Sequence, residues 1–314
     1  MLIDVSKMRQ KSRIDLVTVG HLAVDTITTP TAAVPRQALG GSPTYVSVAA
    51  AKLGAKVSVI SKVGGDFPDE YLEWLRANDV GVSGLSKVRD AVSTRFALSY
   101  DKSWERKLRL GGRAPPILVT DVPQGFRSRA VHVAPIAGEV SNDVVLRLHR
   151  VCKVLSLDPQ GFVRSFDRKG NVSLKTWNAG DVLSKVDVFK STVKEIEAVT
   201  GKSVVEDAVR EVSGCGVRVV VVTSGLRGSM LFFDEGFYDI PACEPKAVVD
   251  PTGAGDVFVG GFLAEYLTCK DAVWCGCVGS AAASFVVEGF GPERFGERDE
   301  VYERARQIYG KVSG

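Results

Sequence analysis

The sequence has no excess of one charge, no long apolar run and few histidines. Its 40 basic and 37 acidic residues leave a net charge of +3 and are interleaved, so no basic stripe indicates a nucleic-acid partner. No window has the length and apolarity of a membrane span, and the opening MLIDVSKMRQKSRID lacks the apolar segment of a signal peptide. We therefore expect a cytoplasmic protein that binds neither membranes nor nucleic acids.

Metal-binding and dinucleotide-binding motifs are also missing. The six cysteines form no paired C-x-x-C motifs, and the three histidines are scattered. Cys275 and Cys277 lie in the helical pattern VWCGCVGSAAAS, where residues two apart point in different directions, so we interpret them as buried thiols in a reducing compartment. No G-x-x-x-x-G-K-S/T loop occurs, and no G-x-G-x-x-G follows the first predicted strand. A dehydrogenase is thus disfavoured, and a nucleotide would have to bind through the second half of the chain.

The sequence does contain enough apolar material for a large core. Hydrophobic residues make up 45% of the chain and charged residues 25%, and 314 residues suit one large α/β domain or two modest ones. Apolar runs such as RVVVVTSG (218–225) alternate with amphipathic helical patterns, which is typical of a parallel sheet covered on both faces. We expect a doubly wound, mainly parallel α/β sheet sandwiched by helices. The expected strands are at 15–20, 56–61, 129–134, 154–159, 186–191, 217–225 and 228–234, and the expected helices at 43–54, 68–80, 141–152, 193–201, 204–216, 256–268, 271–287 and 297–312.

Two stretches, 24–41 and 91–116, do not follow this order of apolar strands and amphipathic helices. In them polar and apolar residues alternate and turn residues are frequent. Within the second, STRFALSY and RKLRLG are predicted to form an antiparallel pair. Together the two insertions would build a small β-sheet beside the main domain, and a sheet that overhangs the carboxyl ends of the parallel strands would act as a lid. We expect a single domain over 1–314, and the exposed lid offers a surface for a homodimer.

The segment DPTGAGD (Asp250–Asp256) opens a strongly apolar helix. Free amides at a helix start, the positive end of the helix dipole and the lack of Cβ atoms at Gly253 and Gly255 together suit a bound phosphate. The carboxylate of Asp256 would repel that phosphate unless a hydroxyl lay between them, in which case it would accept the hydroxyl proton during attack on phosphorus. The ordinary pKa of aspartate, about 3.9, keeps such a base ionised. From these residues alone, a capped helix after a glycine turn is the alternative.

DPTGAGDVFVGGFLAEYL (250–267) resembles the C-terminal signature of the ribokinase-like (pfkB) carbohydrate kinases. GGSPTYVSVAAAKLGAKVSVISKVGGD (40–66) resembles their glycine-glycine substrate segment, and GHLAVD (20–25) the end of their first strand, so the resemblance covers nearly the whole chain. It implies a doubly wound α/β domain with a small β lid. It also implies transfer of the γ-phosphoryl group of Mg-ATP to a hydroxyl of a small polyol: a sugar, a nucleoside or a cyclitol such as myo-inositol. A non-catalytic nucleotide- or sugar-binding regulatory protein on the same fold is the alternative.

The resemblance further implies roles for individual positions. Asp256 would be the catalytic base, beside an anion hole made by the amides of Gly253, Ala254 and Gly255. The loop TSGLRGS (223–229) would follow the nucleotide, and its contributing residues would be Thr223, Gly225, Gly228 and an Arg227 that reaches the phosphates.

Acceptor and metal residues are implied in the same way. The residues placed against the acceptor are Asp25, Gly40, Gly41, Tyr45 and Glu139. Those near cations are Glu195, for Mg²⁺ through water, and Asp250 with Thr252, for a monovalent cation such as K⁺. Without the resemblance, Asp25 and Glu139 would be interpreted as solvated loop carboxylates.

Two positions depart from the family pattern. Thr192 stands where an Asn-x-x-Glu motif has its asparagine, although its hydroxyl can still orient a metal-bound water. Tyr45 stands where sugar kinases such as ribokinase carry an asparagine that grips hydroxyls, so ribose is disfavoured and a bulkier or flatter acceptor, or a cyclitol, is favoured. A phosphorylated sugar is disfavoured too, because no basic cluster is placed in the pocket. The basic residues of the expected lid are interpreted as a solvated face: Arg95, Arg106, Lys107 and Arg109.

Overall fold

The computed structural model describes residues 14–30, 32–268 and 271–312. Its main element is a nine-stranded sheet in the order β15-β14-β13-β12-β9-β8-β1-β4-β5, parallel except for β14 and β15 at one edge. This confirms the doubly wound, mainly parallel sheet. The strands are β1 (Leu16–Val19), β4 (Val57–Gly64), β5 (Val80–Val88), β8 (Ala130–Val133), β9 (Val154–Leu157), β12 (Val188–Thr192), β13 (Val219–Thr223), β14 (Ser229–Phe233) and β15 (Gly236–Ile240).

The alternation of side chains along β13 shows how one sheet serves two helical layers. Val219 and Val221 belong to the core shared with α1, α8, α9 and α10, whereas Val220 and Val222 belong to the core shared with α3, α6 and α7. Successive strand side chains point to opposite faces, so an unbroken apolar run needs cover on both. The helices are α1 (Ser42–Lys52), α2 (Asp69–Ala77), α3 (Asn142–His149), α4 (Gln160–Val163), α5 (Gly180–Leu183), α6 (Val193–Thr200), α7 (Val205–Gly214), α8 (Ala254–Tyr266), α9 (Ala272–Val286) and α10 (Arg298–Val312), with short 3-10 turns at Val119–Asp121, Gly225–Arg227 and Gly291–Glu293.

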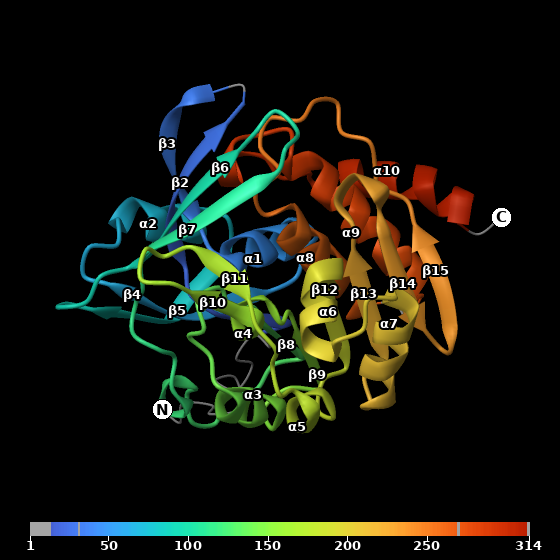
Figure 1. The fold of residues 1–314 in the computed structure, drawn as a ribbon, viewed down its shortest axis with the longest axis horizontal. Coiled ribbons are helices and arrows are strands. Elements are labelled where there is room, and N and C mark those ends of the chain that lie inside the picture. The colour runs from blue at the N-terminus through green and yellow to red at the C-terminus, as the bar shows by residue number, and fades with distance from the viewer. Residues whose placement is uncertain (1–13, 31, 269–270, 313–314) are drawn as a thin grey trace, which may run out of the picture.

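The two insertions form a second sheet, as predicted. Its order is β3-β2-β6-β7, with strands β2 (Ala23–Thr29), β3 (Ala32–Gly40), β6 (Thr94–Tyr100) and β7 (Arg106–Gly112). The central pair β2–β6 is parallel and the outer pairs are antiparallel, including the predicted β6–β7 pair. These strands stand together at one corner of the molecule, beyond α1 (Figure 1). We call this sheet the lid.

Several elements escape the sequence patterns. β5 and β15 lie at the two edges of the main sheet, and the hairpin of β10 (Arg164–Phe166) and β11 (Val172–Leu174) extends the lid through a hydrogen bond from Leu110 N to Gly170 O at 2.8 Å. The predicted helix 68–80 ends at Ala77, before β5. Edge strands carry exposed polar residues and glycines, so their hydrophobic pattern is too weak to detect.

The cysteines lie as the sequence indicates. Cys275 and Cys277 are both buried. Within the part of the chain that the structure describes, no group of three or more His, Cys, Asp or Glu side chains could hold a metal. In the same residues no helix combines the length and the apolarity that a membrane crossing requires.

Candidate active site

The start of α8 is shaped by two glycines. Gly253 has φ +79°, a left-handed conformation that favours glycine, and a Cβ there would lie 2.3 Å from the ring of Tyr45. A Cβ on Gly255 would lie 3.0 Å from Nζ of Lys190. In the described residues the amides of Gly253 and Gly255 donate to no protein acceptor, whereas Ala254 N donates to Pro251 O at 3.3 Å. Two free amides at the positive end of a helix can bind an anion.

Asp256 lies in the first turn of α8 and lines a cavity. Burial raises the pKa of this carboxyl to about 6, although the Lys190 ammonium acts in the opposite direction. The ordinary pKa expected from the sequence is therefore too low. The carboxylate is still the main form at neutral pH, and a general base works best when its pKa lies near the working pH.

The cavity in front of Asp256, which we call the acceptor cavity, contains polar groups without partners. Oδ1 of Asp25 and the hydroxyl of Tyr45 are buried and have no hydrogen-bond partner among the described residues. Burial, with the Asp250 and Asp256 carboxylates adding to it, raises the pKa of Asp25 to about 7. Unpaired buried polar groups cost free energy, so a hydroxylated ligand that bonds to them would be stabilised. The lining residues are Asp25, Gly41, Ser42, Tyr45, Phe96, Leu98, Arg106, Leu108, Ile136, Gln160, Arg164, Thr252, Gly253 and Asp256.

Two arginines, Arg106 and Arg164, line this cavity. Arg106 is exposed, in line with the interpretation of the lid bases as a solvated face, but its place in the cavity lining was not expected. Arg106 begins β7, and Arg164 begins β10. Arg164 is only 7% exposed, and its Nη1 donates to the backbone oxygen of Ile136 at 3.0 Å. Burial and the nearby Arg106 lower the pKa of Arg164 to about 10. Neither arginine forms an ion pair within the described ranges, so both have N–H groups for an oxygen-rich ligand. Of the other predicted lid bases, Arg95 pairs with Asp66 at 2.7 Å, and Lys107 and Arg109 do not line the cavity.

Glu139 does not face this cavity, contrary to the sequence-based expectation. Its buried carboxylate accepts hydrogen bonds from the backbone amides of His21, Ile136 and Ala137 at 2.7–3.1 Å. Those three amides account for the burial of Glu139, which ties the loop after β8 to the end of β1. The position in sequence was compatible with either role, because only the fold decides where the carboxylate points.

The predicted glycines Gly40 and Gly41 do lie at the acceptor cavity or behind it. Gly41 is part of the lining, and a Cβ on Gly40 would lie 2.0 Å from Oδ2 of Asp25. The absence of a side chain at Gly40 therefore lets the Asp25 carboxylate lie against the backbone.

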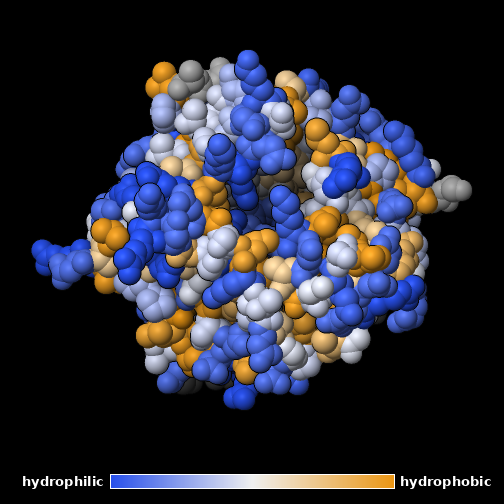
Figure 2. Space-filling view, viewed as in Figure 1, coloured by the Kyte–Doolittle hydropathy of each residue, from blue (hydrophilic) through white to orange (hydrophobic). Residues whose placement is uncertain are grey.

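A second cavity, of about 320 Å³, opens beside the α8 start, and we call it the donor cavity. Its size is in the range of small-ligand sites. Its lining includes Leu226, Phe258 and Val287, which make much of the wall apolar. Arg227, predicted to reach the phosphates, is not part of the lining, and Gly253, predicted for the anion hole, lines the acceptor cavity instead. The remaining residues predicted for the nucleotide and the anion hole do line the donor cavity: Thr223, Gly225, Gly228, Ala254 and Gly255. Figure 2 shows the same face of the molecule hollowed between the lid and the main body, with hydrophilic side chains at the rim.

Glu195 and Thr192 form a reciprocal cap on α6. Oε2 of Glu195 accepts from the amide and the hydroxyl of Thr192, both at 2.8 Å, and Glu195 N donates to the Thr192 hydroxyl at 3.3 Å. Oε1 of Glu195 accepts no hydrogen bond within the described residues. Thr192 also lines the donor cavity, so this cap lies next to the place where phosphates would sit.

Asp250 and Thr252 are brought together beneath the lid. Oδ1 of Asp250 accepts from the amide and the hydroxyl of Thr252 at 2.9 and 2.6 Å, and Oδ2 accepts from Gly291 N at 2.9 Å. The hydroxyl of Tyr100, at the end of β6, lies 2.9 Å from the Thr252 hydroxyl. The lid thus contacts the loop that leads into α8.

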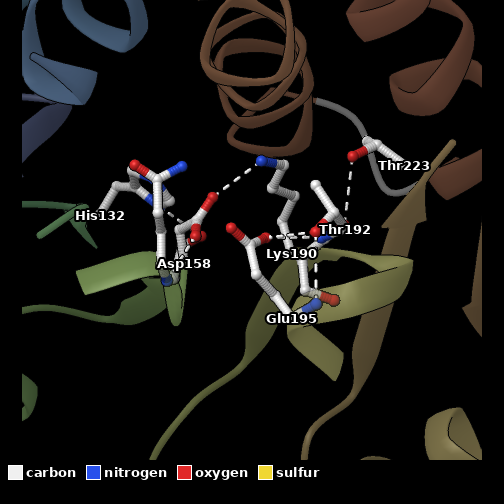
Figure 3. A network of polar contacts seen from close by, with 9 residues as sticks. His132, Asp158, Lys190, Thr192, Glu195 and Thr223 are labelled. Carbon is white, nitrogen blue, oxygen red and sulfur yellow. Dashed lines mark hydrogen bonds and ion pairs between the residues drawn. The ribbon is translucent and has the colours of Figure 1, made fainter. Parts of the chain in front are cut away.

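A buried ion pair near the α8 start escaped the sequence reasoning. Nζ of Lys190 lies 2.8 Å from Oδ2 of Asp158, and the two side chains are 3% and 2% exposed. Figure 3 shows His132 next to Asp158, Thr192 next to Lys190, and the side chain of Glu195 close to both members of the pair. The sequence feature that could have predicted this pair is the lysine inside the apolar strand VDVFKST, because a buried charge requires a partner.

Known proteins that are similar to this chain are kinases. The family model of the pfkB family carbohydrate kinases matches residues 13–295. A cytidine kinase of Thermococcus kodakarensis is 29% identical over 88% of this chain and 98% of that protein. An inositol 3-kinase of Oryza sativa is 31% identical over 86% of this chain and 68% of that protein.

Among solved structures, a pyrophosphate-dependent kinase of the ribokinase family, bound to a pyrophosphate analogue and myo-inositol, superposes with a TM-score of 0.78. That likeness covers 92% of this chain and 99% of the other, at 23% identity, and it shows the fold. The chain is a kinase with the ribokinase fold and belongs to the pfkB family of carbohydrate kinases.

Proposed function

We propose that the chain transfers the γ-phosphoryl group of Mg-ATP to a hydroxyl of a small polyol, with Asp256 as the general base. One observation carries the proposal. Asp256 is a half-buried carboxylate that lines the acceptor cavity, and it shares a helical turn with the free amide of Gly255, which lines the donor cavity. An acceptor hydroxyl and a donor phosphate would therefore meet at the start of α8.

The proposed chemistry follows from this arrangement. The acceptor oxygen forms a bond to the γ-phosphorus, its proton passes to Asp256, and the bond from the γ-phosphorus to the leaving oxygen of ADP breaks. Negative charge on the phosphoryl oxygens would lie against the amides of Gly253 and Gly255, at the positive end of α8. In a loose transition state a weak but well-placed base is sufficient.

The described residues fit Mg²⁺ as an ion that arrives with ATP. No cluster of acidic and histidine side chains in the described ranges could hold a metal alone, but Oε1 of Glu195 is left to bind a metal-bound water beside the donor cavity. When bound, the ion would neutralise charge on the donor phosphates. A monovalent cation such as K⁺ at Asp250 and Thr252 stays a prediction, because the hydrogen bonds of the Asp250 carboxylate already account for its burial.

The donor cavity favours a nucleoside triphosphate over pyrophosphate. Leu226 is 80% exposed beside this cavity, and together with Phe258 and Val287 it offers an apolar surface for an adenine ring. Pyrophosphate has no apolar part with which to cover these side chains. This supports ATP here, although the structural neighbour named above is pyrophosphate-dependent.

The acceptor cavity favours a polyol that also carries a carbonyl or carboxylate oxygen. Asp25 and Tyr45 can bond to hydroxyls, whereas Arg106 and Arg164 only donate and therefore bind acceptor oxygens best. A nucleoside, through its base carbonyl, and a sugar acid meet both needs. A cyclitol has hydroxyls but no carbonyl or carboxylate oxygen. It is kept in the acceptor panel because an inositol kinase is among the relatives.

The lid would close over the acceptor so that water does not take its place. The contact between Tyr100 and Thr252 supports this, since it joins the end of a lid strand to the loop before α8. A homodimer through the lid stays a prediction, which sedimentation of the full chain would test.

The proposal is tested by measuring ADP release from the purified chain with nucleosides, sugar acids, inositols, hexoses and pentoses. The same panel with pyrophosphate in place of ATP tests the donor. We expect ADP release with ATP and at least one acceptor, and release slower by about 10²–10⁴-fold from Asp256→Asn. Calorimetric binding of ATP and an acceptor without ADP release from any compound would instead favour the non-catalytic alternative.

A further inference from the structure

Lys190 and Asp158 lie at the carboxyl ends of neighbouring parallel strands. In the ladder between β9 and β12, Leu157 pairs with Phe189, so Asp158 and Lys190 are the next residues of each strand. Both side chains are almost completely buried. Burying two charges costs solvation free energy that their attraction does not fully return, so such a pair is weak support for a role in stability alone.

The ammonium lies directly beneath the α8 start. It is close enough to Gly255 that a Cβ there would approach Nζ to 3.0 Å. One of its three hydrogens is directed to Asp158, and no other hydrogen bond from Nζ exists in the described residues. The carboxylates of Asp158, Asp256 and Glu195 outweigh burial and raise the pKa of Lys190, so Lys190 is a permanent cation among three acids.

The charge of Asp256 depends on groups from several elements. Burial favours its neutral form, and Lys190 from β12 opposes this more than any other neighbour. The other charged or titratable groups that act on it are Asp158 after β9, Arg106 of β7, Arg164 of β10, Asp25 of β2 and Tyr45 of α1. Of the three cations, Lys190 is the one that lies beneath the helix start, whereas Arg106 and Arg164 line the acceptor cavity.

We propose that Lys190, held in place by Asp158, is a positioning residue that keeps the Asp256 carboxylate charged and ready to receive the acceptor's proton. This inference rests on the proposed function of Asp256. It explains why a costly ion pair is buried under Gly255, and why the sequence has no side chain at that glycine.

The direction of the effect follows from the charges. Without the ammonium, burial and the remaining carboxylates act with less opposition, and the pKa of Asp256 rises further. The base is then protonated at neutral pH, so the acidic limb of the profile of kcat/KM against pH moves to higher pH and the rate recovers in alkali. A role of Lys190 in binding phosphate alone would lower the rate about equally at every pH.

The test compares Lys190→Met with the double variant Asp158→Asn/Lys190→Met. The single change leaves Asp158 buried and unpaired, which threatens folding, whereas the double variant removes both charges. We expect the midpoint of the acidic limb to move to higher pH by about 1–2 pH units in the single variant. In the double variant it should move in the same direction but by less, because Asp158, which itself raises the pKa of Asp256, is also removed. Lys62→Met is the matched control: Lys62 pairs with Asp121 at 2.6 Å, lines neither cavity, and its loss should leave the limb in place.

A second readout needs no acceptor. Titration of the carboxyl ¹³C resonance of Asp256, assigned by its absence from Asp256→Asn, reports the pKa directly in the free protein. A folded double variant with an unmoved Asp256 titration and an unmoved acidic limb would overturn the inference. Retained turnover in Asp256→Asn would instead overturn the proposed function, so the two failures are distinguishable.

Discussion

The acceptor cavity and the donor cavity meet at the start of α8 but are lined by different kinds of residue. The acceptor cavity presents side chains that carry charge or titrate, such as Asp25, Arg106 and Arg164. Two buried polar atoms in it, Oδ1 of Asp25 and the hydroxyl oxygen of Tyr45, have no partner within the described part of the chain. The donor cavity presents glycines and apolar side chains such as Leu226 and Phe258. Backbone amides and an apolar slot suit a donor whose phosphates and base vary little, whereas discrimination among hydroxylated acceptors requires placed polar side chains.

Asp256→Asn should have the largest effect, because it removes the carboxylate at the helix start where the two cavities meet. We expect phosphoryl transfer to fall by about 10²–10⁴-fold while ATP binding stays within a few-fold of the original protein. ADP release and calorimetric titration with ATP measure the two effects. Turnover at the original rate would remove Asp256 from the mechanism.

Asp25→Asn should damage the acceptor side alone. We expect KM for the acceptor to rise about 10²-fold and KM for ATP to stay unchanged, since a carboxylate that binds hydroxyls is lost. A rise in both KM values would show that Asp25 does not act on the acceptor side alone.

The same change should stabilise the protein at high pH. The pKa of Asp25 is raised from 3.8 to about 7, so the folded state holds a proton that the unfolded state has lost between these values, and stability falls as pH rises through that window. The cost is fully present above pH 7, and its removal should add about 4 kcal/mol to the free energy of unfolding at pH 8 and almost nothing near pH 4. Denaturant unfolding at both pH values measures this, and an equal effect at the two would contradict it.

Tyr45→Phe should have a smaller effect on the acceptor side. The ring that packs against Gly253 remains, so the α8 start keeps its shape, and only the unpartnered hydroxyl is lost. We expect KM for the acceptor to rise by up to about tenfold, equivalent to one hydrogen bond, with ATP unaffected. An unchanged KM across the acceptor panel would show that the Tyr45 hydroxyl does not touch the acceptor.

Leu226→Ser should give the smallest effect, and on the donor side alone. The side chain is 80% exposed, so the melting temperature should hardly change, but its contact with a nucleotide base would be lost. We expect KM for ATP to rise about three- to tenfold, with KM for the acceptor unchanged. If pyrophosphate proves to be the donor, this variant should behave as the original protein, which would overturn the apolar-slot argument.

Hydrophobic periodicity predicted the sheet because a strand that is buried on both faces has an unbroken apolar sequence, as in the four valines of β13. It also predicted the lid, whose strands alternate polar and apolar residues. β5 was missed because an edge strand with exposed serines and an exposed lysine has little apolar pattern to detect. The helix start was predicted from Gly253, Gly255 and Asp256, since amides, dipole and carboxylate belong to one local segment.

The acceptor residues were harder to predict, because they come from separate elements. Arg164 lies on a short strand far along the chain from Asp25, and Arg106, which is exposed as expected, also lines the cavity. Glu139 had an equally plausible position in sequence, yet its carboxylate binds three backbone amides.

The amino-acid order alone therefore determined the layers, the lid and the glycine-rich start of α8, because those features depend on short-range periodicity and on neighbours within one turn. The burial of Asp25, the arginines in the acceptor cavity and the Lys190–Asp158 pair were decided by the folded chain. Charge and solvation act through space over a few ångströms, and only the packing of strands and loops that are far apart in sequence sets those distances.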